Sequence, residues 1–344
     1  MTRRTIAAVL VAAVAALALA ACGERTEPTG APRQQKLSLM LDFFPNADHA
    51  GLYAAKAHGD FARAGLDVDV QTPGDPSAPL RLLAAGRVDL AISYEPELLL
   101  ARDHGLKLVA VGAIVQKPLT SIISIGKRAI TNPAQLKGRT VGTAGIPYQS
   151  AYLHQILTSA GVDPASVKEV NVGFNLVPAM KTKKVDATLG AFWNYEGVQL
   201  RLQRQRPQII RMDRVGVPGY QELVVVARQS DLAHGGERVR RFMRALGQGY
   251  AAVRRNPQAG VKPLLAANPD LDPALQLASA RATLPVFFPA RGKPFGWMEP
   301  SEWTRYGDWM FRNKLLQHPP NAARALDDEF LPGQGLADSS SDAG

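Results

Sequence analysis

The sequence predicts an α/β protein of two lobes, each with a mostly parallel sheet flanked by helices. From residue 37 onward, short apolar segments of strand length alternate with helical segments, a pattern typical of helices layered on parallel sheets. This alternation occurs twice, over 37–120 and over 121–227, before a mostly helical C-terminal part. The chain of 344 residues is long enough for two domains of ordinary size.

The first lobe is predicted to comprise 37–120 together with about 228–331. Its first helix places Leu52, Ala55 and Phe61 on one apolar face. Strands are expected at 37–41, 66–70, 88–93 and 108–114, and helices at 50–64, 79–85 and 97–102. Helices that cover this lobe are expected at 238–255, 257–267, 273–284 and 302–315.

The second lobe is predicted to span 121–227, with a crossover strand at each end that carries the chain between the lobes. These two strands are expected at 121–125 and 223–227. Asn132-Pro133 opens a short helix, and Gly161 ends a longer one. Further strands are expected at 140–143, 167–172 and 187–192, and helices at 149–160, 177–181 and 197–204.

A similar motif precedes one strand in each lobe. Val88-Asp89 leads into a strand that ends in Tyr94-Glu95. Val185-Asp186 leads into a strand that ends in Tyr195-Glu196. Ligands of open α/β sheets lie beyond the carboxyl ends of the strands. We therefore expect both aromatic–carboxylate pairs to face a cleft between the lobes.

The N-terminus indicates export. Two arginines precede an uncharged run, 5–21, that is rich in Ala, Val and Leu, and this order is typical of a secretory signal. The run ends in Leu19-Ala20-Ala21-Cys22, which resembles the lipobox of bacterial lipoproteins. We expect 1–21 to be a signal peptide, Cys22 to be lipidated, and 22–36 to be a flexible tether.

The overall charge does not indicate a nucleic-acid partner. The formal net charge is +10, but the basic residues are scattered and form no stripe interleaved with aromatic side chains. Cys22 is the only cysteine, which excludes disulfides within the chain. The tail 332–344 is rich in Asp, Ser and Gly and is expected to be disordered.

Residues 42–53 form the first candidate binding segment, because they connect the first strand to the first helix at the predicted cleft. Two aromatic rings offer flat faces for stacking, and an amide and an imidazole offer hydrogen bonds. The alternative is a turn fixed by Pro45, with Asp48 as helix cap, and for Asp48 we prefer that alternative. The candidate ligand-binding residues are Asp42, Phe43, Asn46, His49 and Tyr53.

This segment resembles the signature Asp-Trp-x-Pro-Asn-x-x-His-x-Gly-Leu-Tyr-x-Ala of solute-binding proteins for thiamine pyrimidine precursors, which are related to fungal synthases of the same pyrimidine. A second specific match is Trp193-Asn194-Tyr195-Glu196-Gly197. The sequence departs at Phe43, where the family usually has Trp, so a stacking face remains but the indole donor is lost. Weaker matches occur at 65–68, 86–89, 93–95, 136–138, 145–147 and 185–187, and looser likeness extends to about 226.

The resemblance implies a periplasmic-binding-protein-like fold of type II and a role as the substrate-binding lipoprotein of an ABC importer. In that role the protein captures an aminopyrimidine in the cleft and delivers it to a permease and its ATPase, for thiamine biosynthesis or salvage. The resemblance also implies a monomer without cofactor or enzyme activity. Its expected location is the cell envelope, lipid-anchored and facing the periplasm or the outside.

An aminopyrimidine is a flat ring with an amine beside a ring nitrogen, so a carboxylate suits the amine and an aromatic face suits the ring. The candidates are Tyr94, Glu95, Trp193, Asn194, Tyr195 and Glu196, with the two carboxylates as anchors and the aromatic rings as walls. The alternative is that Trp193 and Phe192 are core and that Glu196 favours a helix N-terminus electrostatically. For Phe192 we prefer the core interpretation.

Gly145 and Tyr148 are further candidates, because they lie in a turn, 145–150, before a helix whose free N–H groups suit an anionic ligand group. No metal is expected, since the six His are scattered without metal-ligand spacing. The sequence also contains no Gly-rich phosphate loop, no His-Glu-x-x-His and no nucleophile elbow.

Two alternative functions stay open. In the first alternative, the protein has the same importer role but carries riboflavin, a sulfonate or nitrate. Two carboxylates in the cleft suit an anion poorly. A pyrimidine synthase, like the fungal relatives, needs cytoplasmic residence and a lysine that forms an imine with pyridoxal phosphate. The fungal enzymes also use a cysteine-rich motif, and this chain has one Cys, placed in the lipobox.

Overall fold

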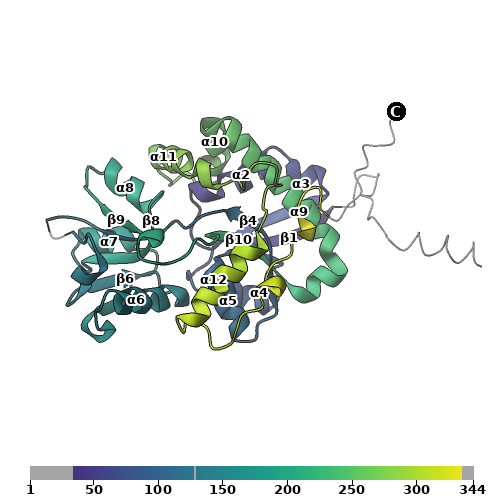
Figure 1. The fold of residues 1–344 in the computed structure, drawn as a ribbon. Helices are drawn as coiled ribbons and strands as arrows, with labels where there is room; N and C mark the ends of the chain where they lie inside the picture. Colours follow the sequence, from purple (N-terminus) through teal and green to yellow (C-terminus); the bar gives the residue numbers. More distant parts are fainter. Residues whose placement is uncertain (1–33, 128, 335–344) are drawn as a thin grey trace, which may run out of the picture.

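The computed structural model describes residues 34–127 and 129–334. These residues form two α/β lobes, with the second lobe at the left of Figure 1. The expected signal peptide, Cys22, most of the tether and the tail from residue 335 lie outside the described residues. Residues 332–334 are described, and the Gln334 carbonyl accepts a hydrogen bond from Arg240 at 2.9 Å.

Each lobe contains one five-stranded sheet. The first sheet contains β1 (Gln35–Met40), β2 (Leu66–Gln71), β3 (Leu90–Ser93), β4 (Leu108–Val115) and β10 (Leu223–Arg228). The second contains β5 (Thr120–Ser124), β6 (Thr140–Thr143), β7 (Lys168–Asn171), β8 (Ala187–Phe192) and β9 (Gln208–Arg211). The strand orders are β2-β1-β3-β10-β4 and β7-β6-β8-β5-β9.

The two sheets share one topology. In each sheet four strands run in one direction, and one central strand, β10 or β5, is antiparallel to both of its neighbours. The places of β1, β2 and β3 in the first order are taken by β6, β7 and β8 in the second. The prediction of two α/β lobes with mostly parallel sheets is therefore confirmed.

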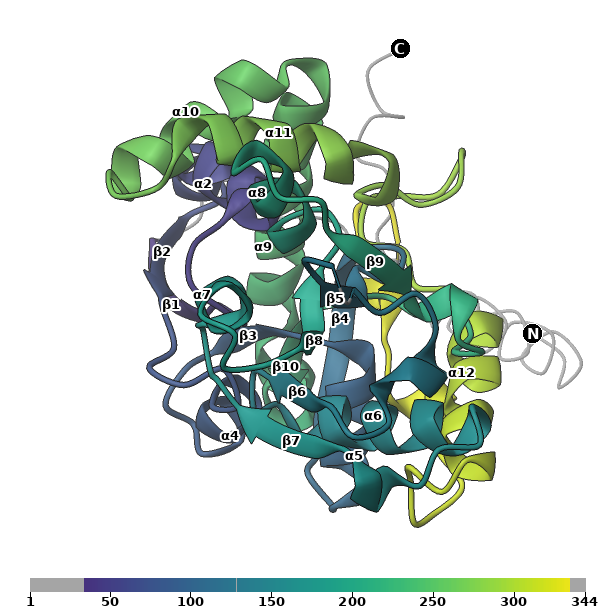
Figure 2. The same ribbon diagram turned by 90° about the vertical axis from the view of Figure 1, so that its left-hand side faces the viewer.

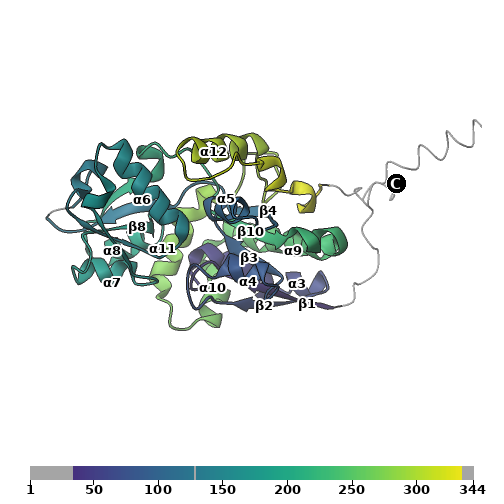
Figure 3. The same cartoon turned by 90° about the horizontal axis from the view of Figure 1, so that it is seen from below.

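Helices flank both sheets. Those of the first lobe are α2 (Ala50–Ala57), α3 (Asp60–Arg63), α4 (Pro79–Ala84), α5 (Glu95–Asp103), α9 (Gln229–Arg255), α10 (Pro257–Ala267), α11 (Pro273–Thr283) and α12 (Pro300–Arg312). Those of the second are α6 (Pro147–Ser159), α7 (Leu176–Lys181) and α8 (Glu196–Leu202). Figure 2 shows α10 and α11 above α8, and Figure 3 shows α12 on the other side, near α6.

None of the helices in the described ranges is both long enough and apolar enough to cross a membrane.

The chain crosses between the lobes twice, after β4 and before β10. The strand expected at the end of the second lobe is therefore a central strand of the first sheet, where β10 pairs with β3 and β4. Buried Glu222 joins the two crossings. It accepts hydrogen bonds from the N–H groups of Leu119 at 2.6 Å and Thr120 at 2.8 Å, and from the Thr120 hydroxyl at 2.8 Å.

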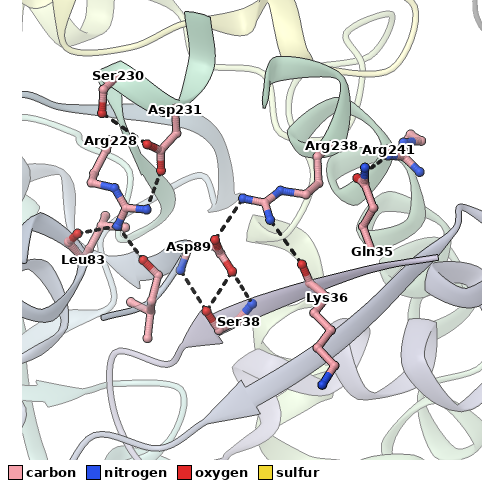
Figure 4. A network of polar contacts seen from close by, with 11 residues as sticks. Gln35, Lys36, Ser38, Leu83, Asp89, Arg228, Ser230, Asp231, Arg238 and Arg241 are labelled. Carbon is pink, nitrogen blue, oxygen red and sulfur yellow. Dashed lines mark hydrogen bonds and ion pairs between the residues drawn. The ribbon is translucent and has the colours of Figure 1, made fainter. Parts of the chain in front are cut away.

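The repeated Val-Asp motif fixes equivalent strands in both lobes. Asp89, before β3, accepts hydrogen bonds from the Ser38 N–H at 2.8 Å and hydroxyl at 2.9 Å, and pairs with Arg238 at 2.9 Å (Figure 4). Asp186, before β8, accepts a bond from the Thr140 N–H of β6 at 2.9 Å. Both motifs lie at the amino ends of their strands. They therefore stabilise the end of each sheet that is opposite the predicted cleft.

Some boundaries differ from the sequence-based expectation. The strand β9 was not predicted, because it is a short edge strand with only Ile209 and Ile210 as apolar residues. The helix expected over 50–64 is divided at Gly59, whose φ of 74° is left-handed. The first strand begins at Gln35, so the last two residues of the expected tether belong to the sheet.

Candidate ligand-binding site

A cavity that is open to solvent lies between the lobes and is lined by residues of both. The cavity lies beyond the carboxyl ends of strands from both sheets, as expected for open α/β sheets. Its lining residues are Asp42, Phe43, Asn46, Tyr94, Ala144, Ile146, Gln149, Leu176, Gly190, Phe192, Tyr195 and Glu196.

Asp42 is a buried carboxylate held from two sides. Its Oδ2 accepts a hydrogen bond from the Tyr94 hydroxyl at 2.8 Å, and its Oδ1 lies 2.8 Å from His49 Nε2. His49 Nδ1 accepts the Asn46 N–H at 3.2 Å. A neutral imidazole therefore carries its proton on Nε2 and donates it to Asp42. His49 is fully buried and positions Asp42, which keeps lone pairs for a donor in the cavity.

Asn46 lines the cavity and also caps the short helix η1 (Ala47–His49). Its Oδ1 accepts the Asp48 N–H at 2.8 Å, and its Nδ2 donates to the Phe44 carbonyl at 3.1 Å. The cap of this turn is therefore Asn46, and the expectation that Asp48 is the cap is corrected. Asp48 lies two positions after the cap, inside the short helix, where its own N–H is the donor and its side chain contacts Asn194.

Glu196 brings a second carboxylate to the cavity from the first turn of α8. Its Oε2 accepts the Phe192 N–H at 2.7 Å. Burial raises the pKa of Glu196 to about 7, against the hydrogen bonds from the N–H groups of Phe192 and Glu196, which lower it. The carboxyl group therefore titrates near neutral pH, because removal from water disfavours its charged form.

Aromatic rings from both lobes meet at the cavity. The ring centroids of Phe43 and Phe174 are 4.7 Å apart, in an edge-to-face arrangement. The rings of Tyr94 and Phe192 are 6.4 Å apart, also edge to face. Edge-to-face contacts of this kind stabilise aromatic clusters beyond the area they bury. The rings of Phe43, Tyr94, Phe192 and Tyr195 give the cavity its apolar walls, and Phe174 packs behind Phe43.

Asn194 joins the two lobes and lies outside the cavity lining. Its Nδ2 donates to Asp48 Oδ1 at 2.8 Å and to Thr283 Oγ1 at 2.7 Å, and all three side chains are buried. Burial raises the pKa of Asp48 to about 6, and the hydrogen bond from Asn194 opposes this rise. We call Asp48, Asn194 and Thr283 the interlobe clasp. A second contact across the lobes is the bond from Gln276 Nε2 to the Tyr195 hydroxyl, at 3.0 Å.

Trp193, an expected wall of the site, faces away from the cavity. Its Nε1 donates to the Pro118 carbonyl at 3.0 Å, and the Arg211 guanidinium lies 4.6 Å from the ring centroid. Side chains alternate along a strand, so Gly190 and Phe192 of β8 face the cavity and the next residue does not. Phe192, which we expected in the core, therefore takes the wall position that we expected for Trp193.

Glu95 and Tyr53 also lie outside the lining. Glu95 Oε2 accepts the Gln221 N–H at 2.7 Å, beside the second crossing. Burial raises the pKa of Glu95 well above its usual range, which favours the neutral acid. Tyr53 lies on α2, which packs against α10. Glu95 thus supports the crossing, and Tyr53 the helical coat.

Tyr148 and Gly145 support the lining from behind. The Tyr148 ring is fully buried, 5.4 Å from the Tyr94 ring, and its hydroxyl lies 3.1 Å from Thr120 Oγ1. Gly145 lies between two lining residues with a φ of 79°, and a Cβ there would approach Asn171 Nδ2 to 2.3 Å. Only glycine fits this turn.

Six lining residues were not sequence-based candidates. Five of them are apolar or glycine, and such residues have the same sequence pattern in a cavity wall as in a core. The sixth, Gln149, lies within the turn 145–150 that we expected to meet a ligand group. The six are Ala144, Ile146, Gln149, Leu176, Gly190 and Phe192.

The charged lining residues are Asp42 and Glu196, and the lining contains no Lys or Arg. Across residues 34–127 and 129–334, no group of three or more His, Cys, Asp or Glu is arranged to hold a metal ion. The arrangement therefore suits a flat ligand that donates hydrogen bonds, and it offers no cation to an anionic one.

Two lobes with a cavity at their strand ends define a periplasmic-binding-protein-like protein, and solved structures share this fold. The periplasmic nitrate-binding protein of Synechocystis superposes with a TM-score of 0.69 at 12% identity, covering 89% of this chain and 93% of that one. The alkanesulfonate-binding protein of Xanthomonas axonopodis pv. citri gives a TM-score of 0.67 at 19% identity, covering 86% and 99%.

The chain belongs to the NMT1/THI5-like family, whose sequence pattern it matches over residues 46–260. It is 32% identical over 317 residues to the formylaminopyrimidine-binding protein of Halalkalibacterium halodurans, covering 91% of this chain and 96% of that one. It is 34% identical over 253 residues to a Haemophilus influenzae protein named for thiamine biosynthesis, covering 73% and 80%.

A more distant relative, of Legionella pneumophila, is named 4-amino-5-hydroxymethyl-2-methylpyrimidine phosphate synthase. It is 22% identical over 313 residues, covering 89% of this chain and 95% of that one. The resemblance to thiamine-pyrimidine binding proteins and to the related synthases is therefore confirmed.

The substitution Glu196→Gln tests the buried carboxyl group through the pH dependence of stability. The pKa of Glu196 is about 7 in the folded protein, against an ordinary 4.5, so the folded state keeps a proton that the unfolded state releases. Between these values, the free energy of unfolding should fall as the pH rises, by on the order of 2–3 kcal/mol from this group. Urea unfolding between pH 5 and pH 8 should show a shallower decline for the Gln variant. Parallel curves for the two proteins would contradict a pKa this high.

Proposed function

We propose that the protein is the solute-binding component of an importer and that it captures an aminopyrimidine precursor of thiamine between its lobes. The observation that carries this proposal is one cavity that combines two carboxylates, Asp42 and Glu196, with aromatic walls. The amine of an aminopyrimidine donates to carboxylates, and its flat ring packs against rings such as Phe43 and Phe192. The relatives named for formylaminopyrimidine binding and for thiamine biosynthesis support the same ligand class.

Two observations disfavour the other solutes. A sulfonate or nitrate requires cationic groups, whereas the charged groups here are the carboxylates of Asp42 and Glu196. A relative named for riboflavin binding is 27% identical to this chain, against 32% for the relative named for formylaminopyrimidine binding. The charge of the site therefore favours a ligand that donates hydrogen bonds to carboxylates.

The protein binds its ligand without converting it. The relative named as a binding protein shares 32% identity with this chain, whereas the Legionella relative named as a synthase shares 22%. The single Cys of the chain lies at the expected lipidation position, far from the cavity-lining segments in sequence. These observations support capture and release as the whole activity, carried out by a monomer without cofactor.

Ligand capture is coupled to closure of the lobes. The cavity takes Asp42 from the first lobe and Glu196 from the second, so a ligand that contacts both favours the closed form. The interlobe clasp adds a direct bond between Asp48 and Asn194 in that form. Closure by bending at the two crossings then gives the permease a shape that distinguishes the loaded protein.

Lipid attachment at Cys22 holds the protein at the membrane surface, where the permease and its ATPase act. The sequence that supports this proposal is the apolar run followed by Leu19-Ala20-Ala21-Cys22. The periplasmic-binding-protein-like fold supports a location outside the cytoplasm.

Isothermal titration of the purified protein tests the ligand. Formylaminopyrimidine or hydroxymethylpyrimidine should bind, whereas riboflavin, an alkanesulfonate and nitrate should not. Glu196→Gln should weaken binding roughly 10- to 100-fold, because a hydrogen bond to a charged group contributes about 1.5–3 kcal/mol. The control is Glu169→Gln, whose carboxylate is held by Ser150 and Thr143 outside the lining. Binding of an anion in place of any pyrimidine would refute the proposal.

The substitution Asn194→Ala tests the clasp. Loss of the bond from Asn194 to Asp48 removes a contact made only in the closed form, so affinity should fall at least about tenfold, mainly through faster dissociation. Thr283→Val should have a smaller effect, because it removes the bond from Asn194 to a neutral hydroxyl and leaves the bond from Asn194 to the Asp48 carboxylate. Stopped-flow measurements of the association and dissociation rates of each variant test this prediction. Equal losses in the two variants, or none in the first, would exclude the clasp from closure.

Cell fractionation tests the anchor. The full chain, expressed in a bacterial host, should sediment with membranes. Its processed N-terminal residue, Cys22, should carry the added mass of a lipid. Cys22→Ser should abolish this mass and shift the protein to the soluble or unprocessed fraction. A wild-type N-terminus without lipid would show that this export signal does not provide an anchor.

A further inference from the structure

Gln149 brings a carboxamide to the cavity from the first turn of α6, and its side chain is buried. The amide oxygen accepts the Ala144 N–H at 2.8 Å. This bond fixes the orientation of the amide, because only the oxygen can accept a proton from that N–H. The nitrogen, Nε2, must therefore point away from the Ala144 backbone.

Gly190 provides the space that the amide nitrogen occupies. It lies on β8, lines the cavity and has a φ of 108°. A Cβ at this position would lie 2.3 Å from Gln149 Nε2 and 2.6 Å from its Cδ. Any other residue would displace the amide, so Gly190 and Gln149 form one structural unit at the carboxyl end of β8.

The hydrogen-bonding capacity of Gln149 is only partly used inside the protein. The amide nitrogen carries two protons, and among the described residues the hydrogen bond of the Gln149 side chain is made by its oxygen. The protons of the amide nitrogen therefore remain for a group in the cavity. The carboxylates of Asp42 and Glu196, by contrast, are acceptors when ionised, and the Tyr94 hydroxyl already donates to Asp42.

We propose that Gln149 is a specificity-determining residue that donates a hydrogen bond to an acceptor atom of the bound pyrimidine, either a ring nitrogen or the oxygen of a formyl substituent. This inference rests on the function proposed above. Asp42 and Glu196 then accept from the ligand amine while Gln149 donates to its acceptor. The site thereby requires a donor and an acceptor on one small ring, and it rejects rings that lack either.

Gln149→Glu is the sharpest test, because the variant keeps the shape and the oxygen that accepts the Ala144 N–H but replaces the donor by an acceptor. Titration calorimetry with formylaminopyrimidine should show binding at least about tenfold weaker than wild type. Gln155→Glu, on the same helix but outside the lining, should bind like wild type. Gly190→Ala should weaken binding as Gln149→Glu does, and circular dichroism confirms that each variant is folded.

The same titrations with the aminopyrimidine that lacks the formyl group locate the acceptor. If Gln149 donates to the formyl oxygen, the difference between wild type and Gln149→Glu disappears with this ligand; if it donates to a ring nitrogen, the difference persists. Binding of both ligands by Gln149→Glu within twofold of wild type would overturn the inference and leave the proposed function intact. A wild-type protein that binds neither pyrimidine would instead refute the proposed function.

Discussion

The packing of the two lobes buries carboxylates, and a buried carboxylate requires hydrogen-bond partners. Three of these groups show how the partners are supplied. Asp42 is held by His49 within its own lobe, and Asp48 by Asn194 across the interface. Glu196 is held by a backbone N–H of its own corner. The two carboxylates of the cavity, Asp42 and Glu196, are therefore held in position by the protein itself.

The two lobes have the same topology but use equivalent corners differently. Glu95 starts α5 after β3, and Glu196 starts α8 after β8, in matching places of the two sheets. The second crossing passes beside the first corner and supplies the Gln221 N–H to Glu95. Glu196 instead accepts an N–H group of its own corner, from Phe192, and its side chain lines the cavity. One corner consequently supports the interlobe connection, and the other lines the cavity.

The sequence was sufficient to predict the two lobes, because short apolar segments that alternate with helical segments specify the strands and helices locally. It also predicted that both strand-end corners face the space between the lobes, where residues of each line the cavity. It did not separate Phe192 from Trp193, because a one-residue change of face depends on where the strand ends. It did not predict the contacts of Asn194 between the lobes, because the partners Asp48 and Thr283 are 146 and 89 residues away. Contacts of that range follow from packing and leave no local pattern.

The segment from Trp193 to Glu196 connects the cavity to the first crossing between the lobes through a short chain of contacts. Glu196 lines the cavity, and Asn194 forms the clasp. The Trp193 N–H donates to the Leu119 carbonyl at 3.1 Å, and the Leu119 N–H donates to Glu222 at 2.6 Å. Leu119 therefore links the binding corner to the carboxylate that joins both crossings. Because four consecutive residues contact the cavity, the clasp and the first crossing, a shift of this corner would also displace Leu119 at the first crossing.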